Sequence, residues 1–420
     1  MHRPTTFEET RSPLPVRALN RCGVLLEKIR STSLRPEELT EAAKRHTGLD
    51  DFGGGEFFEP LSRLVESCQR EARLNVIGRI ALRSDLLSTL CNRLLMRRDQ
   101  QQQPEIANQE ITEPLFITGL PRSGTTLLHT LLAADPAHRA PLTWEVMTPS
   151  PASNHNKQRR IRHATRNLSS LRWLAPTFQR VHALGAELPQ ECVSLMSPTF
   201  MSDQFDTMYD APSYRAWFLK QDLRPAYEYH RRFLQHLQHR QCAQRWVLKA
   251  PAHMFAAQAL LSVYPDARFV QVHRNPLEAI ASVSSLIAIL RGVFSDAVDL
   301  VQIGRDAMEY WVEAIATFTR ARDRFSSERI CDLSYVEIRR DPIRAVRSIY
   351  KHFSWPLSAE AEQRMRSVLI NQPPEQNGFH RYHASQFGLE SASDFAPYCE
   401  RFGLSAATAT KPAKHAGVSV

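Results

Sequence analysis

The clearest structural signal in this chain is the segment Gly119-Leu120-Pro121-Arg122-Ser123-Gly124-Thr125-Thr126. It follows the short apolar run Leu115-Phe116-Ile117-Thr118, and after it leucines recur on one helical face between Leu127 and Leu132. A short run with a β-branched bias, a glycine-rich turn and a helical pattern, in this order, predict a strand, a tight turn and a helix.

The same order of patterns returns further along the chain. Apolar runs lie at 246–248, 269–272 and 330–336, and the last two precede the helix-start signals Asn275-Pro276 and Asp341-Pro342. An asparagine or aspartate followed by proline is typical of a helix N-cap and its first residue. Strands that alternate with helices predict an α/β fold, here a P-loop-like three-layer arrangement with a central parallel sheet.

Three regions follow from these patterns. They are an N-terminal helical region over residues 1–110, an α/β domain over 111–402, and a tail over 403–420 that we expect to be disordered. The helices expected in the first region lie at 16–29, from Pro36 to Gly48, at 61–73 and at 76–95, with the polar stretch 97–103 as the linker to the α/β domain.

The composition is that of a globular protein with a positive charge. Lys and Arg number 53 against 44 Asp and Glu, a formal charge of +9, and 43% of residues are hydrophobic. The charge favours an anionic partner. The seven cysteines are scattered without a C-x-x-C pair, which argues against a disulfide framework and a zinc site, so we expect no metal. No signal peptide or membrane span is recognisable, so we expect a reduced, cytoplasmic protein.

The loop has the two-glycine frame of a phosphate-binding loop, with Thr125 in place of the usual lysine. Backbone N–H groups at the helix start, together with the hydroxyls of Ser123, Thr125 and Thr126, still form a cradle for an anion. Without the lysine, a triphosphate would be poorly neutralised, and a nucleotide with a single 5′-phosphate and a less charged transferring group fits better. The alternative is a glycine-rich turn that binds nothing.

A second candidate anion site follows the strand at 269–272. Arg274 stands at the strand end, and Ser282 lies eight residues later in the next helix. Arginine can form a bidentate contact with a phosphate, to which the serine adds a donor. An NTPase strand would end in an aspartate that holds magnesium, whereas this one ends in His-Arg. The alternative for Arg274 is a surface ion pair.

Together, the two sites resemble those of sulfotransferases that use 3′-phosphoadenosine 5′-phosphosulfate (PAPS), closest to the bacterial branch that shares its loop with tyrosylprotein sulfotransferases. The similarity extends to 246–251 and 333–337 and spans roughly 114–355, so the α/β domain is expected to be a sulfotransferase domain. The resemblance implies a metal-free reaction with PAPS as co-substrate. The residues that it implies for PAPS binding are Arg122, Ser123, Gly124, Thr125, Thr126, Arg274, Ser282 and Tyr335.

The resemblance also implies catalytic residues. A glutamate at about the distance of Glu145 is the general base in the tyrosylprotein enzymes, and Lys249 resembles the lysine on the bridging oxygen of the donor. No other carboxylate occurs between Glu145 and Glu187, and the basic chain in between would keep Glu145 ionised. A structural, arginine-paired glutamate is the alternative. His253 is a rival base or else a packing residue.

Two other functions stay open. A P-loop kinase or NTPase needs a lysine at 125 and a strand-end aspartate, both absent. A non-enzymatic basic-surface protein would use the basic helix that carries an apolar stripe from Ile161 to Leu174, but only Trp173 stands among its arginines, which argues against nucleic acid. We expect a small-molecule, lipid or glycan acceptor, with peripheral membrane contact as a further possibility.

Overall fold

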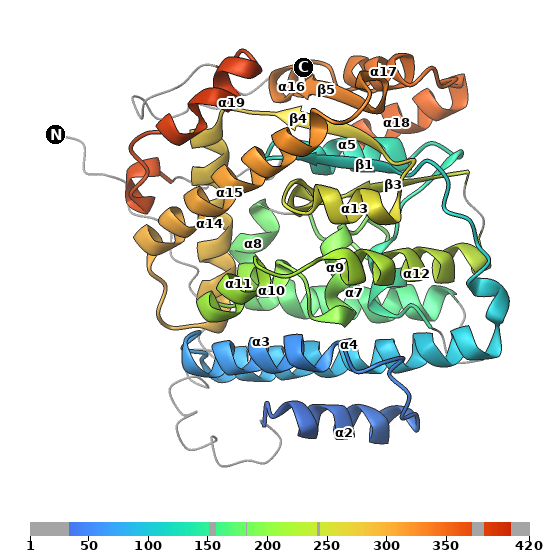
Figure 1. The fold of residues 1–420 in the computed structure, drawn as a ribbon, viewed down its shortest axis with the longest axis vertical. Coiled ribbons are helices and arrows are strands. Elements are labelled where there is room, and N and C mark those ends of the chain that lie inside the picture. The colour runs from blue at the N-terminus through green and yellow to red at the C-terminus, as the bar shows by residue number, and fades with distance from the viewer. Residues whose placement is uncertain (1–32, 151–156, 182, 242–243, 372–381, 405–420) are drawn as a thin grey trace.

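The computed structural model describes residues 33–150, 157–181, 183–241, 244–371 and 382–404. The expected helix at 16–29 and nearly all of the expected disordered tail lie outside these residues. Figure 1 shows the sheet in the upper half of the molecule and the first helices as a separate layer below it.

All strand pairs of the central sheet are parallel, as predicted. The strands are β1 (Leu115–Gly119), β2 (His138–Arg139), β3 (Arg245–Lys249), β4 (Arg268–His273) and β5 (Ile330–Ser334). Their order in the five-stranded sheet is β2-β3-β1-β4-β5. Because β1 lies between β3 and β4, the loops that leave the carboxyl ends of these three strands meet at one edge, where open parallel sheets bind ligands.

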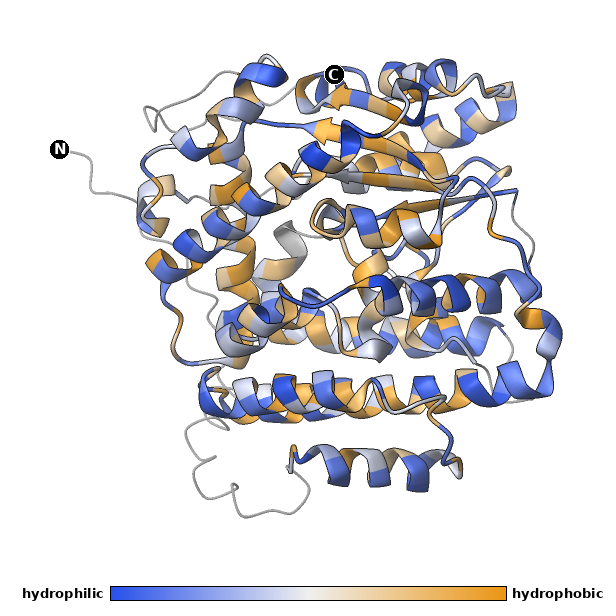
Figure 2. Cartoon of the chain, viewed as in Figure 1, coloured by the Kyte–Doolittle hydropathy of each residue, from blue (hydrophilic) through white to orange (hydrophobic). Residues whose placement is uncertain are grey.

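Helices cover both faces of the sheet, which confirms the three-layer arrangement. Leu115 and Ile117 of β1 pack on one side with α5 (Thr125–Ala133) and α17 (Pro342–His352). Phe116 points the other way, into the core formed with helices further along the chain. Those helices are α12 (Arg224–Arg240), α13 (Ala257–Val263), α14 (Pro276–Phe294) and α15 (Leu300–Arg322). The strands are accordingly hydrophobic along most of their length (Figure 2).

The N-terminal helices share a second core with segments from later in the chain. The helices are α2 (Pro36–Thr47), α3 (Phe58–Arg70) and α4 (Val76–Gln102). They pack with Phe205, Tyr214 and the last turns of α14. The prediction of a linker at 97–103 is wrong, because α4 continues to Gln102 and Asp99, 4% exposed, accepts a hydrogen bond from Arg240 at 2.8 Å.

Predicted helix ends are mostly confirmed. Gly48 adopts the left-handed conformation (φ +71°) after α2. Asn275 caps α14 by accepting a hydrogen bond from the Glu278 N–H, and Pro276 is the first helical residue. The strand expected over 330–336 ends earlier, at Ser334, because this serine caps the short helix α16 (Tyr335–Arg340).

The remaining helices lie mainly between the sheet and the N-terminal layer. They are α6 (Thr143–Met147), α7 (Lys157–Leu174), α8 (Pro176–Val181), α9 (Cys192–Met196), α10 (Gln204–Met208), α11 (Pro212–Phe218), α18 (Ala359–Asn371) and α19 (Ala396–Arg401). Within the described ranges, α14 alone is long and apolar enough to cross a membrane, and 72% of its apolar window is buried inside the protein. It is a core helix here.

Candidate active site

The loop between β1 and α5 needs its glycines. Gly119 has φ +136°, and a Cβ there would lie 2.3 Å from the carbonyl oxygen of Val272. Gly124 has φ +84° at the N-cap of α5. Arg122 also lies in the left-handed region (φ +62°), where side chains other than glycine are uncommon. The turn therefore holds the backbone in a strained conformation at the start of α5, where the helix dipole favours an anion.

The second predicted anion site lies against this loop. Arg122 Nε donates to Ser282 Oγ at 3.4 Å, and the guanidinium of Arg274 donates to the carbonyl oxygen of Arg122. The Arg274 guanidinium carbon lies 4.3 Å from the centre of the Tyr335 ring. A Cβ at Gly124 would lie 3.3 Å from that ring. The structure thus brings together the loop, the Arg274–Ser282 pair and Tyr335, which are far apart in the sequence.

The site is rich in positive charge. Burial lowers the pKa of Arg122 from its ordinary value, and the nearby charge of Arg274 acts in the same direction. The Arg122 guanidinium nevertheless stays charged at neutral pH. Arg274 is 8% exposed and Arg122 is half-buried. Arg274 also pairs with Glu278 at 3.2 Å, and bound anionic groups would further offset the repulsion between the two arginines.

The loop hydroxyls have different surroundings. Ser123 and Thr125 are buried, and Ser123 Oγ donates to the carbonyl oxygen of Leu120 at 2.5 Å. Thr126 is exposed, and its Oγ1 accepts a hydrogen bond from Lys249 Nζ at 3.2 Å. Thr126 is therefore the loop residue whose hydroxyl group contacts Lys249, a further cationic side chain of the site.

Lys249 also forms an ion pair with Glu191, a residue that the sequence did not single out. Lys249 ends β3 with its side chain 4% exposed, and Glu191 stands at the N-cap of α9 with 27% of its side chain exposed. The Glu191 carboxylate therefore reaches solvent beside the loop. The only hint in the sequence is that the acid-free stretch after Glu145 ends at Glu187, four residues before Glu191.

Glu145, the predicted base, lies in a different set of contacts. Its Oε2 accepts from the backbone N–H of Leu142 at 3.0 Å, and its Oε1 accepts from Arg139 at 2.8 Å. Arg139 also donates to the carbonyl oxygen of Leu237 at 2.9 Å and lies over the Trp246 ring. Both carboxylate oxygens of this 5%-exposed residue are thus engaged within the protein, which favours the structural alternative.

His253, the rival base, lies in the core. It follows β3 in a short turn, is 0% exposed, and its Nδ1 is 2.7 Å from the Tyr227 hydroxyl. Its ring packs edge-on against Phe116 with the ring centres 4.9 Å apart. Burial, followed by the charges of His230 and Lys249, lowers its pKa well below the ordinary value. These surroundings favour the packing alternative.

Comparison with known proteins identifies the family of this chain. Residues 114–359 match the model of the family described as "Sulfotransferase family". The chain belongs to the sulfotransferase family. The match begins one residue before β1 and ends at the first residue of α18, so it contains the loop, Lys249, Glu191 and the Arg274–Ser282 pair. Membership of this family argues against the alternative function, a P-loop kinase or NTPase.

Two solved structures of sulfotransferases share the fold over most of the chain. Sulfotransferase STF1 from Mycobacterium tuberculosis H37Rv is 34% identical, with a TM-score of 0.75 over 88% of this chain and 98% of that one. Sulfotransferase STF9 from Mycobacterium avium is 28% identical, with a TM-score of 0.76 over 88% of this chain and 97% of that one. The coverage includes helices outside the family match, so the N-terminal layer is part of the shared fold.

A curated relative is more distant. The omega-hydroxy-beta-dihydromenaquinone-9 sulfotransferase Stf3 of Mycobacterium bovis is 24% identical over 261 residues, which are 57% of this chain and 62% of the relative. The protein of the same name from Mycobacterium tuberculosis matches equally well. The match therefore spans less than two thirds of the length of these relatives.

Proposed function

We propose that this sulfotransferase transfers a sulfuryl group from PAPS to the hydroxyl group of a lipid, with Glu191 as the general base. The contact of Lys249 with both Glu191 and Thr126 carries the proposal, because it joins a solvent-reaching carboxylate and a cation to the anion-binding loop. PAPS supplies a sulfuryl group activated by its bond to a phosphate.

The residues around the loop fit such a donor. Backbone N–H groups of the strained turn and Thr126 suit the 5′-phosphosulfate end. Arg274 and Ser282 both contact Arg122, and they offer a guanidinium group and a hydroxyl group to the 3′-phosphate of the nucleotide. A bisphosphate nucleotide therefore finds cations at both of its charged ends, and the absent loop lysine is not needed.

Sulfuryl transfer needs a proton acceptor and a cation at the leaving oxygen. The acceptor oxygen forms a bond to sulfur, the bond between sulfur and the phosphate oxygen breaks, and its electron pair leaves with the bisphosphate. Glu191 takes the hydroxyl proton. Lys249, fixed at the end of β3, neutralises the charge that develops on the leaving oxygen, and its contact with Thr126 orients it toward the loop.

Apolar side chains near the Glu191–Lys249 pair suit a lipid acceptor. A narrow cleft, whose free volume is only about 10 Å³, lies between α9, which starts directly after Glu191, and the turn that follows Lys249. Its lining is apolar or aromatic except for Asp203, and includes Met196, Met201, Phe218, Phe255 and Tyr310. The two Stf3 relatives are named as sulfotransferases of omega-hydroxy-beta-dihydromenaquinone-9, which is a lipid with a hydroxyl group.

An acceptor comparison tests this proposal. With sulfate-labelled PAPS, we expect label in a long-chain prenyl alcohol and much less in a sugar or a tyrosine peptide. Label in the sugar or peptide alone would keep the sulfotransferase reaction but overturn the lipid acceptor. No label in any acceptor, with no binding of PAPS, would overturn the reaction itself.

A further inference from the structure

The outward face of α7 is strongly basic. Arg159, Arg162, His163 and Arg166 line one hollow on this face, and all four residues are exposed. They recur at intervals of three and four residues, so they share one side of the helix. The helix, with the sequence KQRRIRHATRNLSSLRWL, contains no Asp or Glu. We call these four residues, together with Trp173, the basic face.

The opposite side of α7 fixes the helix to the protein. Ala164, 1% exposed, packs with Ile161 and Leu168 against Trp144. The Arg160 guanidinium carbon lies 4.4 Å from the centre of the Trp144 ring, and the same group donates to the carbonyl oxygen of Thr148. Because apolar contacts hold this side inward, the basic face is turned to solvent.

Two arginines of the basic face, Arg162 and Arg166, have no carboxylate in their own helix. Over the described ranges, no ion pair joins Arg162 or Arg166 to a carboxylate. Two exposed arginines elsewhere illustrate local pairing: Arg364 contacts Glu360 at 2.8 Å, and Arg320 contacts Glu313 at 3.0 Å. A cluster of like charges without acids repels itself and is stabilised by an anionic partner.

Trp173 adds an apolar anchor to the same face. It is 54% exposed and lies seven residues, two helical turns, after Arg166. An exposed tryptophan at the edge of a cationic helix face is typical of helices that lie in the headgroup region of a membrane. Nucleic-acid surfaces that stack bases use several aromatic side chains, and this face has one.

We propose that the basic face docks this protein on an anionic membrane surface. The proposal deepens the lipid acceptor proposed above and rests on it for its purpose, although docking itself requires no turnover. Each arginine near the surface of an anionic membrane raises the binding affinity about fivefold. Trp173 inserts between the headgroups and sets the depth.

Docking by α7 brings the reaction site toward the lipid. Trp144 packs under α7, and its neighbour Leu142 forms a β-bridge with Pro189. The next residue, Gln190, donates its backbone N–H to the carbonyl oxygen of Pro141 at 2.7 Å, and Glu191 follows. The proposed base is thus tied by a short chain of backbone contacts to the layer that carries the basic face.

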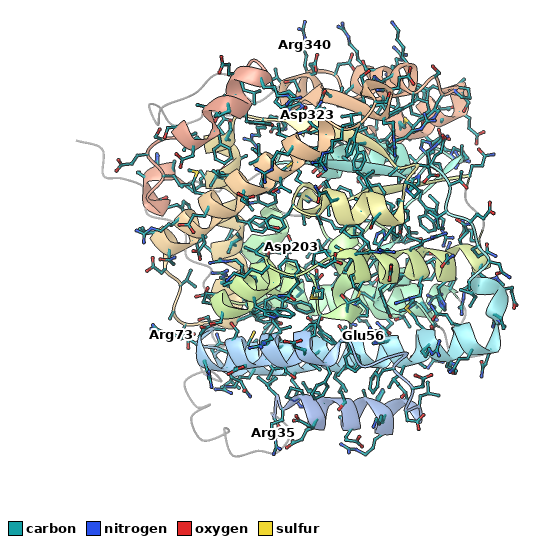
Figure 3. All side chains as sticks on the ribbon, viewed as in Figure 1. Arg35, Glu56, Arg73, Asp203, Asp323 and Arg340 are labelled. Atoms are coloured by element: carbon teal, nitrogen blue, oxygen red, sulfur yellow. The ribbon has the colours of Figure 1, made fainter. Side chains whose placement is uncertain are left out.

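Vesicle sedimentation tests the proposal on the full chain without PAPS. We expect binding to vesicles of equal parts phosphatidylglycerol and phosphatidylcholine, little binding to phosphatidylcholine alone, and loss of binding at high salt. The double variant R162E/R166E should bind at least about 25-fold more weakly. The matched control is R340E/R344E, an equal charge change on exposed arginines of α16 and α17, and it should bind like the wild type. Arg340 lies beside the sheet, in the upper part of Figure 3.

Each outcome decides. Equal loss of vesicle binding in both double variants would mean that net charge alone causes the binding, which would overturn the docking face. Vesicle binding by R162E/R166E as tight as that of the wild type would also overturn it. Binding to a single-stranded oligonucleotide but not to the anionic vesicles would assign the face to nucleic acid instead. A melting-temperature shift with adenosine 3′,5′-bisphosphate shows that each variant is folded, and R162Q/R166Q serves if the charge reversal fails to fold. Sulfation of a short, water-soluble alcohol should be unchanged in R162E/R166E, which separates docking from the reaction.

Discussion

Lys249 forms an ion pair with Glu191 at the end of β3. The ammonium group also contacts Thr126 in the first turn of α5, so the pair joins three segments at the carboxyl edge of the sheet. A lysine between a carboxylate and an anion-binding loop serves two roles: it holds the carboxylate in place, and it stays available to a leaving oxygen. The pair is the structural basis for our proposal that Glu191 accepts the proton.

Replacing Glu191 by glutamine should remove the base but keep the donor site. We expect E191Q to lower kcat about 10²- to 10⁴-fold, the range that general-base catalysis contributes, while the melting-temperature shift with adenosine 3′,5′-bisphosphate persists. The control is E187Q, four residues earlier, where the glutamate is exposed. Wild-type turnover in E191Q would remove Glu191 as the base.

Glu145 should behave as a structural residue. E145Q leaves the Arg139 guanidinium, 8% exposed, without its carboxylate, and removing one member of a buried pair costs about 3–5 kcal/mol. We expect urea unfolding at a lower midpoint, with turnover per folded molecule near the wild type. The double variant R139M/E145L, which removes both charges, should recover part of the stability. A folded E145Q with no turnover would return the role of base to Glu145.

The loop and several helix ends were predictable because their signals are local. The loop, Asn275-Pro276 and the helix stop at Gly48 each depend on residues next to one another in the chain, and the structure has them as predicted. Glu191 was not predictable in this way, since its contact with Lys249 spans 58 residues of irregular chain and short helices. A contact of that kind depends on packing between layers, which no periodic pattern records.

The end of α4 shows a different limit. The polar stretch 97–103 reads as a linker by composition, yet arginine and glutamine are good helix formers, and Asp99 pairs with Arg240 on α12. Glu145 lies between these cases. Its pairing with an arginine was one of two alternatives from the sequence, and the partner, Arg139, is only six residues away.

Acid should destabilise the protein through its buried histidines. Burial lowers the pKa of His129 to about 4, and its Nε2 donates to the Val247 carbonyl oxygen at 3.1 Å. Below the ordinary pKa of 6.5 the unfolded chain binds a proton that the folded chain does not, so stability is full above 6.5 and falls as the pH drops toward 4. Between pH 7 and pH 5 this histidine accounts for a loss of about 2 kcal/mol.

The variant H129Q keeps a donor for the carbonyl oxygen but cannot titrate. Urea unfolding at pH 7 and at pH 5 should therefore show a smaller loss in H129Q than in the wild type, by about 1–2 kcal/mol. Identical losses in the two proteins would mean that His129 takes up no proton on unfolding.

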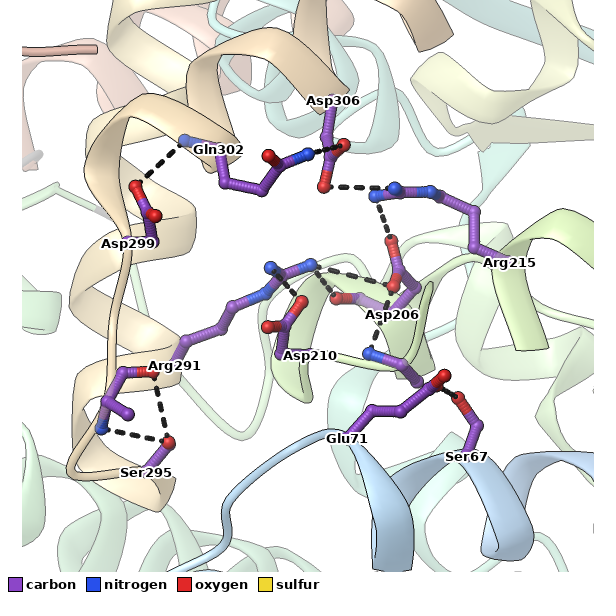
Figure 4. A network of polar contacts seen from close by, with 12 residues as sticks. Ser67, Glu71, Asp206, Asp210, Arg215, Arg291, Ser295, Asp299, Gln302 and Asp306 are labelled. Atoms are coloured by element: carbon purple, nitrogen blue, oxygen red, sulfur yellow. Dashed lines mark hydrogen bonds and ion pairs between the residues drawn. The ribbon is translucent and has the colours of Figure 1, made fainter. Parts of the chain in front are cut away.

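A buried ionic network holds the helices beside the apolar cleft. Arg291 of α14 donates to Asp210 at 2.6 Å and to the carbonyl oxygen of Asp206 at 2.8 Å (Figure 4). Arg215 joins Asp206 to Asp306 of α15, at 3.3 and 2.9 Å. Burial raises the pKa of Asp206, whereas the positive charges of Arg291 and Arg215 lower it. The Asp206 carboxylate therefore depends on both arginines to stay ionised inside the protein.

R291M should therefore lower the free energy of unfolding by about 3–5 kcal/mol, measured in urea. The matched control is R320M on α15, where the pair with Glu313 is exposed and its loss should cost less than about 1 kcal/mol. A cost no greater in R291M than in R320M would show that the network does not support the fold.

The central claim is that two separate anion sites hold one nucleotide, and calorimetric titration tests it most directly. Without added metal, adenosine 3′,5′-bisphosphate should bind more tightly than ATP or adenosine 5′-phosphate, and R274A should weaken the bisphosphate about 10- to 150-fold, as expected for lost charge-assisted hydrogen bonds. Adenosine 5′-phosphate, which lacks the 3′-phosphate, should bind R274A as it binds the wild type. Equal affinity for ATP and the bisphosphate, or equal weakening of both adenosine phosphates in R274A, would contradict the account.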